Sequence, residues 1–153
     1  MDNLLSSILI VDDDPGIRNM LSTVLNNEGF SVETAANGKQ AIKTCERTPF
    51  DVALIDIELP DMKGTELLTK LKQIQPRIIK IIITGHPTIE SAVKAVNQRA
   101  EGYLLKPFEV EDLLRMIKRL LDEKTSEYLR ITAEIASEKE KTPVVKYQRS
   151  ERW

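Results

Sequence analysis

Hydrophobic positions along the chain alternate between short continuous runs and longer segments with helical spacing. Three runs are almost wholly apolar and end in polar residues: Ile8–Val11, Val52–Ile55 and Ile79–Ile83. Strands that are buried on both faces of a parallel sheet have this pattern. Two weaker runs, Phe30–Thr34 and Gly102–Leu105, complete the set. The pattern therefore predicts five strands, whose centres are 22 to 28 residues apart.

The segments between these runs carry apolar residues at intervals of three and four, which is typical of helices that pack on a sheet. Asp14 is the expected N-terminal cap of the first helix, because Pro15 follows it at a position that favours proline. Thr88 is expected to cap the fourth helix, and the fifth is expected to begin after Pro107. Repeated strand–helix units predict an α/β fold with a five-stranded, parallel, doubly wound sheet.

The composition is that of a globular protein, with 41% hydrophobic and 30% charged residues. The 22 basic and 24 acidic residues give a net charge of -2, so direct binding to nucleic acid is not expected. A single cysteine, Cys45, excludes an internal disulfide and fits a reducing compartment. No apolar run reaches the roughly 18 residues that a membrane span needs. We expect a cytoplasmic protein that does not bind membranes.

Polar residues gather where four of the predicted strands end. Asp12 and Asp13 follow the first strand and Asp56 the third, while Thr84 follows the fourth and Lys106 the fifth. The carboxyl ends of parallel strands meet at one edge of the sheet, where open α/β sheets bind their ligands. We therefore expect these side chains to converge.

These residue types indicate phosphoryl transfer to an aspartate. Carboxylates that are held close together repel one another, and a hard divalent cation such as Mg²⁺ relieves that repulsion. A carboxylate beside the cation is an oxygen nucleophile that can take a phosphoryl group. The ammonium group of Lys106 and the hydroxyl of Thr84 would then neutralise and hold the phosphoryl oxygens.

Four sequence motifs carry a family resemblance. They are Ile8-Leu9-Ile10-Val11-Asp12-Asp13-Asp14-Pro15, then Leu54-Ile55-Asp56-Ile57-Glu58-Leu59-Pro60 with Gly64, then Ile83-Thr84-Gly85, then Tyr103-Leu104-Leu105-Lys106-Pro107-Phe108. In this order and spacing, over about residues 7–122, the chain resembles the receiver domain of two-component response regulators, of the stand-alone chemotaxis type. The resemblance implies a flavodoxin-like sheet with strand order 2-1-3-4-5 and a receiver domain at residues 1–122.

The resemblance also implies roles for the acidic residues. Asp56 would accept a phosphoryl group from a histidine kinase or a phosphotransfer protein. Mg²⁺, the one cofactor expected, would be bound by Asp13, Asp56 and the backbone carbonyl of Glu58, with Asp12 acting through water. The chain would be a signalling protein and not an enzyme, apart from weak self-phosphorylation from small phosphodonors and autodephosphorylation.

The remaining roles implied by the resemblance concern the fourth and fifth strand ends. Thr84 and Lys106 would contact the phosphoryl group, and Thr84 and Tyr103 would form a switch. The Lys106–Pro107 bond is cis in the family. Glu58 and His86 match variable positions that flank the path of hydrolytic water.

Three further residues have simpler expected roles. Asp51 and Asp61 are expected to be loop and turn acids. Cys45 is expected to lie on the core side of the second helix.

The composition changes near Asp122. Residues 122–153 hold seven acidic and seven basic residues, so the whole net charge belongs to residues 1–121. Apolar positions from Leu114 to Ile135 follow a period of 3.5 residues, interrupted by Lys124, as in a coiled coil. We expect residues 123–153 to form a helical extension and a flexible tail. Two interpretations stay open: the helix pairs with a second copy or a target protein, or it is a solvated tail.

Three alternative functions stay open. A haloacid-dehalogenase-like phosphatase also uses an aspartate nucleophile with Mg²⁺, but it needs a second aspartate where this chain has Glu58. A flavodoxin-like cofactor binder needs a phosphate-binding loop after the first strand, where residues 12–14 would repel phosphate. The chain could also be the receiver part of a truncated transcription regulator. The sequence identifies neither the cognate kinase nor the downstream target.

Overall fold

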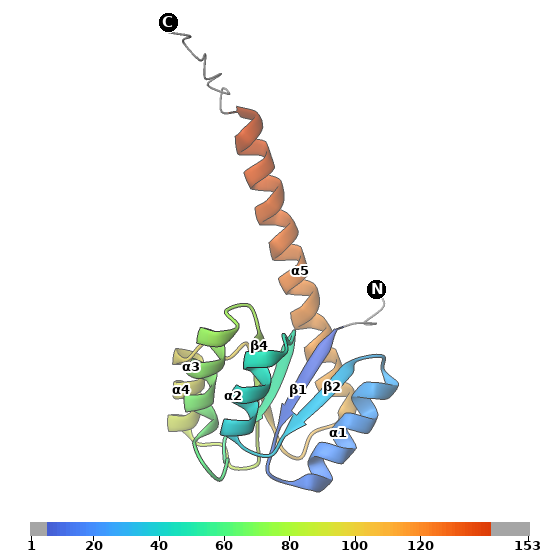
Figure 1. Ribbon diagram of the computed structural model, residues 1–153, viewed down its shortest axis with the longest axis vertical. Helices are drawn as coiled ribbons and strands as arrows, with labels where there is room; N and C mark the ends of the chain where they lie inside the picture. Colours follow the sequence, from blue (N-terminus) through green and yellow to red (C-terminus); the bar gives the residue numbers. More distant parts are fainter. Residues whose placement is uncertain (1–5, 142–153) are drawn as a thin grey trace, which may run out of the picture. The chain divides into compact units, whose positions relative to one another are not determined.

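The expected five strand–helix units are all present in the computed structural model, which describes residues 6–141 (Figure 1). The strands pair in parallel in the order β2-β1-β3-β4-β5, which confirms the predicted fold. The strands are β1 (Ser7–Val11), β2 (Ser31–Ala35), β3 (Val52–Asp56), β4 (Ile79–Thr84) and β5 (Gly102–Leu105). The helices are α1 (Pro15–Asn27), α2 (Gly38–Arg47), α3 (Gly64–Ile74), α4 (Ile89–Asn97) and α5 (Val110–Lys141).

Helices cover both faces of the sheet, so the core has two layers. Alternate residues of a strand point to opposite faces, and β1 shows the consequence. Leu9 packs in the layer that α2, α3 and α4 cover, whereas Ile8 packs in the layer of α1 and the beginning of α5. The central strands are buried on both faces, which explains their almost continuous apolar sequences.

Two helices have N-terminal side-chain caps at the residues that the sequence predicts. The Oδ1 atom of Asp14 accepts hydrogen bonds from the N–H groups of Gly16 at 2.8 Å and Ile17 at 3.4 Å. Thr88 caps α4, and it forms a reciprocal capping box with Ser91. Gly29 follows α1 with φ at 95°, a left-handed conformation that glycine adopts without steric cost. The caps at Asp14 and Thr88 fix where two loops of the sheet's carboxyl edge end.

The apolar run of β4 contains one residue that the sequence analysis did not single out. Lys80 is only 1% exposed, and its Nζ atom donates hydrogen bonds of 3.2 Å to the Ile78 carbonyl and to Oε1 of Glu101. A buried ammonium group requires such partners because its desolvation is costly. The pair lies at the amino end of β4 and β5, at the opposite edge of the sheet from the predicted site.

The fifth helix runs without a break from Val110 to Lys141, and the chain divides into two compact units after Leu121. In the second unit the apolar side chains of Tyr128, Ile131 and Ile135 are about half exposed. The tail expected at residues 142–153 lies outside the described residues. Among the described helices, none is long and apolar enough to cross a bilayer.

Candidate functional site

Three carboxylates converge at the carboxyl edge of the sheet. β1 and β3 are neighbours, and their register places Val11 opposite Ile55, so the residues that follow meet. Asp12, Asp13 and Asp56 each bring one oxygen to within 4.8 Å of the others. Asp12 and Asp56 are buried, whereas Asp13 is exposed. The cluster is therefore accessible from one side.

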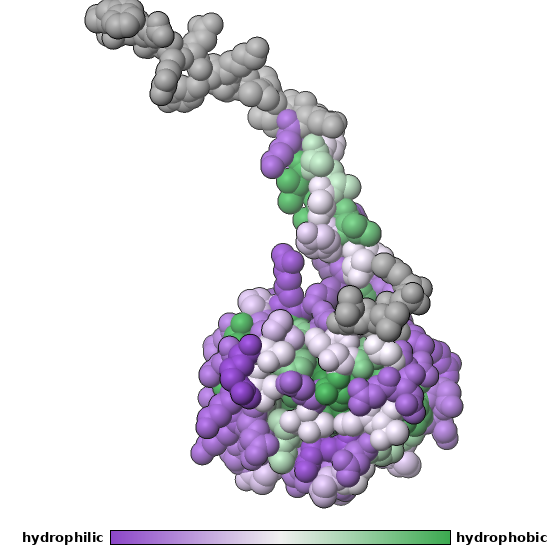
Figure 2. Space-filling view, turned by 45° about the vertical axis from the view of Figure 1, so that its right-hand side comes forward, coloured by the Kyte–Doolittle hydropathy of each residue, from purple (hydrophilic) through white to green (hydrophobic). Residues whose placement is uncertain are grey.

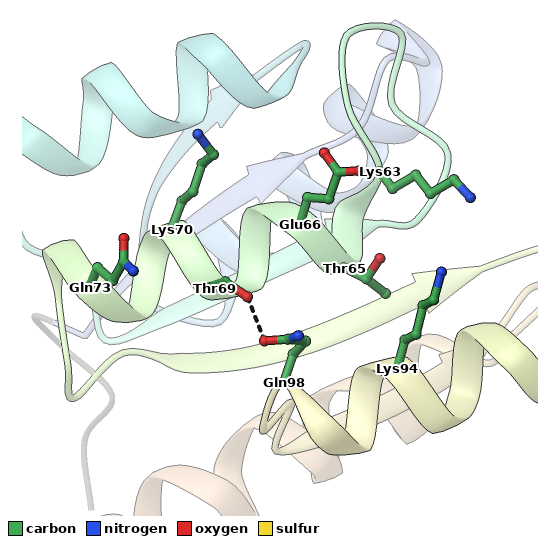
Figure 3. Close-up of a pocket in the computed structure, with 8 residues that line it drawn as sticks. All are labelled: Lys63, Thr65, Glu66, Thr69, Lys70, Gln73, Lys94 and Gln98. Atoms are coloured by element: carbon green, nitrogen blue, oxygen red, sulfur yellow. Dashed lines mark hydrogen bonds between the residues drawn. The ribbon is translucent and has the colours of Figure 1, made fainter.

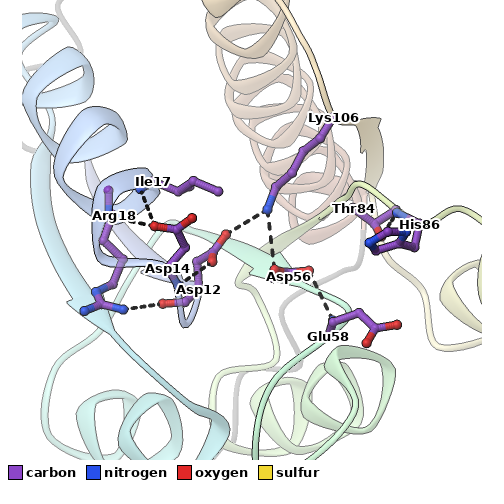
Figure 4. Close-up of polar contacts among 10 residues, drawn as sticks. Asp12, Asp14, Ile17, Arg18, Asp56, Glu58, Thr84, His86 and Lys106 are labelled. Carbon is purple, nitrogen blue, oxygen red and sulfur yellow. Dashed lines mark hydrogen bonds and ion pairs between the residues drawn. The ribbon is translucent and has the colours of Figure 1, made fainter.

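Lys106 reaches this cluster from the end of β5 (Figure 4). Its Nζ atom lies 3.0 Å from Oδ2 of Asp12 and 3.4 Å from Oδ2 of Asp56. Burial alone would lower the pKa of Lys106, but the hydrogen bond and charge of Asp12, joined by those of Asp56, raise it above its ordinary value. The lysine is therefore a permanent cation between the two buried carboxylates. Its bond to Pro107 is cis, as the resemblance implies.

The carboxyl group of Asp56 has a perturbed pKa. Burial raises its pKa above the ordinary value, although the Glu58 N–H and Lys106 act in the opposite direction. The Glu58 N–H donates a hydrogen bond of 3.1 Å to Oδ1 of Asp56. The side chain of Glu58 is exposed and points away from the cluster (Figure 4). Glu58 therefore meets Asp56 through its backbone.

The end of β1 is held by the start of α1. Oδ1 of Asp12 accepts a hydrogen bond of 2.9 Å from the N–H of Asp14. The backbone carbonyl of Asp12 accepts a 2.7 Å hydrogen bond from the guanidinium group of Arg18 (Figure 4). Sequence reasoning missed Arg18, since a basic residue on the first turns of a helix has no distinctive pattern. Arg18 therefore fixes the backbone of Asp12.

A glycine lies against the backbone of Asp56 on its other side. The N–H of Gly64 donates a 2.8 Å hydrogen bond to the carbonyl of Ile57, at the first residue of α3. A Cβ atom at Gly64 would lie 2.3 Å from the carbonyl oxygen of Asp56. The close approach of α3 to the strand end therefore requires glycine.

Thr84 and Tyr103 lie on neighbouring strands. Tyr103 pairs with Ile82 in the register of β4 and β5, two residues before Thr84 and on the same face. Thr84 is fully buried, and its hydroxyl accepts a 3.1 Å hydrogen bond from the N–H of His86. The side chain of His86 is exposed. Figure 4 shows Thr84 on the opposite side of Asp56 from Asp12.

The residues present fit a magnesium ion by charge and by donor type. Three carboxylates face one ammonium group, so the cluster keeps a net charge of -2 with every acid ionised. Carboxylate and carbonyl oxygens are the ligands that Mg²⁺ prefers. The cluster is thus suited to a hard divalent cation.

A hollow between α3 and α4 is lined by other residues than those of the carboxylate cluster (Figure 3). Its volume is about 560 Å³, and none of the carboxylates of the cluster lines it. One of its lysines, Lys94, pairs with Glu90 at 3.2 Å. The lining residues are Lys63, Thr65, Glu66, Thr69, Lys70, Gln73, Lys94 and Gln98. The hollow is therefore separate from the candidate site.

Comparisons with known proteins agree with this fold. The family model described as the response regulator receiver domain matches residues 8–118. A putative response regulator, NtrX-like, of Rickettsia bellii is 40% identical over 117 residues, which are 75% of this chain but only 24% of the relative. The chain therefore spans about a quarter of that relative.

Two solved structures show the same fold. A CheY-like receiver domain protein of Methanospirillum hungatei is 43% identical with a TM-score of 0.79, over 80% of this chain and 98% of that one. A beryllofluoride-activated NtrC4 receiver domain dimer is 36% identical with a TM-score of 0.73, over 77% and 98%.

A parallel α/β sheet that gathers acidic residues and a lysine at its carboxyl edge is the architecture of a phospho-accepting signalling domain. This chain belongs to the response regulator receiver domain family. Receiver domains act in two-component signalling, where they interact with histidine kinases and downstream targets, and they generally use Mg²⁺. They are generally not enzymes.

Proposed function

We propose that Asp56 is the residue that accepts the phosphoryl group from a histidine kinase or a phosphotransfer protein. The observation that carries this proposal is the position of Asp56 between two groups that can bind phosphoryl oxygens: the Lys106 ammonium group, 3.4 Å from its Oδ2, and Thr84, on the side away from Asp12 (Figure 4). An oxygen of Asp56 attacks phosphorus, the bond between phosphorus and the donor's leaving group breaks, and an acyl phosphate forms. Small phosphodonors would react weakly in the same way, and water would slowly remove the group.

Mg²⁺ would be held by carboxylate oxygens of Asp13 and Asp56 and by the backbone carbonyl of Glu58, with Asp12 acting through water. The ion supplies positive charge to the phosphoryl oxygens and relieves repulsion between the acids. Replacing Asp13 with Asn removes a ligand charge, so the affinity for Mg²⁺ should fall more than tenfold. An unchanged NMR titration with Mg²⁺ would refute this ligand set.

Thr84 and Lys106 would bind the phosphoryl oxygens once they are attached to Asp56. Thr84 would move toward them, and its movement would leave room for the ring of Tyr103 to turn inward. A phosphoryl group that binds one arrangement better than the other shifts the population by that difference only. Thr84→Ala should therefore still accept phosphate more slowly, yet lose the conformational shift. Normal target binding by the phosphorylated variant would contradict this coupling.

The central test is labelling with acetyl phosphate and Mg²⁺, followed by intact mass measurement. The wild-type chain should gain the mass of one phosphoryl group, and the Asp56→Asn variant should gain none. A gain of mass in Asp56→Asn would assign the phosphoryl group to another residue.

The signal would leave through the surface next to Tyr103. On α4, Ile89, Val93 and Val96 follow helical spacing and are 51–87% exposed. Leu105 on the neighbouring β5 is 49% exposed. Exposed apolar side chains that gather in this way mark a surface for a partner protein.

We further propose that residues 1–122 act as the receiver domain and residues 123–153 as a helical extension with a flexible tail. The half-exposed seam of Tyr128, Ile131 and Ile135 supports pairing of the extension with a second copy or a target. Deleting residues 123–153 should leave labelling of Asp56 intact and lower the apparent mass in solution or abolish target binding. If both properties match those of the full chain, the extension is only a solvated helix.

One observation favours a second candidate within the family. The chain covers only 24% of its NtrX-like relative, so it could correspond to the receiver part of a longer regulator. A phosphatase stays the weaker alternative, and steady hydrolysis of an external phosphomonoester would be its signature. A cytoplasmic location stays a prediction.

A further inference from the structure

The loop between β3 and α3 is attached to the N-terminus of α2 by a carboxylate. Oδ1 of Asp61 accepts a 2.9 Å hydrogen bond from the N–H of Gly38, and Oδ2 accepts one of 2.9 Å from the N–H of Lys39. The side chain of Asn37, the local cap of α2, accepts a hydrogen bond from the N–H of Gln40. Asp61 therefore satisfies two N–H groups at the start of α2 that the local cap does not reach.

Electrostatics favour this attachment. The first turn of α2 has no acidic residue of its own, so Asp61 supplies the negative charge that stabilises a helix N-terminus. The hydrogen bond from Gly38 is the main cause that lowers the pKa of Asp61, and the hydrogen bond from Lys39 contributes to it. From the sequence, Asp61 is expected to be only a turn acid. Its partners are 22 and 23 residues away, so no local pattern reveals them.

A second contact holds the same loop on the same helix end. Met62 follows Asp61, and its side chain covers Gly38 so closely that a Cβ atom there would lie 2.4 Å from Sδ. The loop therefore meets the start of α2 through both a polar and an apolar contact.

The attached loop also carries Glu58, whose N–H faces Asp56. It is closed by a bridge between Glu58 and Lys63, while the Glu58 N–H binds Oδ1 of Asp56. The carbonyl of Glu58 is the proposed backbone ligand of Mg²⁺. A loop of this length whose far side is fixed to another helix leaves Glu58 little freedom to turn. Preorganised ligands of this kind raise metal affinity, because less order has to be created on binding.

We propose that Asp61 is a positioning residue, which fixes the Glu58 carbonyl for Mg²⁺ by binding the N-terminus of α2. The inference rests on the proposed metal site at Asp13, Asp56 and Glu58. It adds a residue that lies outside the carboxylate cluster and does not touch the ion.

The test compares Asp61→Ala with a matched control, Asp51→Ala. Oδ2 of Asp51 accepts a 2.8 Å hydrogen bond from the N–H of Ser7, at the amino end of β1, so the control loses a similar contact far from the site. The readout is the Mg²⁺ dissociation constant from NMR titration without a phosphodonor. Asp61→Ala should bind Mg²⁺ at least about threefold more weakly, and Asp51→Ala should bind it as the wild type does.

Two further measurements make the result specific. The amide signals of Gly38 and Lys39 should shift in Asp61→Ala, which shows that the attachment is lost, and saturating Mg²⁺ should restore most labelling of Asp56. Asp61→Asn can accept only one of the two hydrogen bonds, so its affinity for Mg²⁺ should be intermediate. This variant replaces Asp61→Ala in the test if the alanine variant does not fold. Wild-type Mg²⁺ affinity in an Asp61 variant whose Gly38 and Lys39 signals have shifted would overturn the inference. A wild-type chain that binds no Mg²⁺ would instead overturn the proposed metal site.

Discussion

The hydroxyl of Tyr103 lies 3.3 Å from Oγ of Ser91, so a hydrogen bond joins the aromatic ring of β5 to α4. This bond stabilises the ring position seen in the structure. Ser91 also closes the capping box of α4 with Thr88, so one serine side chain links the helix start to the ring. The loop that follows Thr84 leads directly into α4. One short segment therefore connects the site to the helix that binds the ring.

The first prediction concerns Ser91→Ala, which removes this hydrogen bond. We predict that the ring of Tyr103 then leaves its position more easily. A partly buried hydrogen bond contributes about 1 kcal/mol, so the ratio of the two ring positions should change about fivefold. The ring signals of Tyr103 in NMR spectra of the unphosphorylated protein report that ratio. Tyr103→Phe removes the same bond and keeps the capping box. The ring signals of residue 103 in this variant should therefore show the same change in the ratio as in Ser91→Ala. A different result for the two variants would assign the effect to the cap.

The second prediction concerns Lys106. Its ammonium group lies 3.4 Å from Oδ2 of Asp56, so Lys106→Ala should slow labelling by acetyl phosphate by about 100-fold, as loss of a preorganised donor does elsewhere. The rate of mass gain measures the effect. Lys118→Ala removes an exposed lysine that pairs with Glu28 and should leave the rate unchanged. Equal rates for both variants would exclude a role of Lys106 in transfer.

The third prediction is a pH dependence of stability in the absence of Mg²⁺. Burial raises the pKa of Asp56 in the folded chain, so folding favours its protonated form. Ionised Asp56 therefore destabilises the fold at neutral pH, and this penalty disappears as the pH falls through the folded-state pKa toward about 4. Asp56→Asn should raise the melting temperature at pH 7, and the difference should shrink as the pH is lowered. A variant that melts below the wild type at pH 7 would reverse this sign.

The fourth prediction concerns Cys45, which lies on the core side of α2. Burial, with a smaller contribution from Glu33, raises the pKa of the Cys45 thiol to about 11. Because the thiolate is the reactive form, a disulfide reagent at pH 8 should modify native Cys45 about 100-fold more slowly than the denatured chain. Absorbance of the released thiol measures the rate, with Cys45→Ser as the blank. Rapid modification of the native chain would show that the helix opens readily.

The sequence predicted the fold well because hydrophobic periodicity decides it. β5 has its predicted bounds, and β2 begins one residue later than predicted, at Ser31, because Phe30 enters the core before the strand begins. Lys80 could not be predicted as buried, since its partner Glu101 belongs to another strand connection. Local patterns give the elements, whereas tertiary partners of single polar residues need the folded chain.

The same division applies to the candidate site. Residues at strand ends, such as Asp56 and Lys106, could be predicted because the topology itself brings them together. Arg18 and Asp61 bind backbone groups, and any polar residue on a helix or loop could do so. Backbone partners leave no matching residue type in the sequence, so these two roles became visible only in the structure.

The contact of Gly64 with Asp56 limits where the domain can respond to phosphorylation. A Cβ at Gly64 would lie 2.3 Å from the Asp56 carbonyl, so the main chain of Asp56 has no space to retreat toward α3. If Asp56 is the acceptor, as proposed, a phosphoryl group on its side chain would add volume and charge that this side cannot accommodate. The displacement would then fall on the ends of β4 and β5, at Thr84 and Lys106. Close packing on one side of Asp56 would thus give the response its direction.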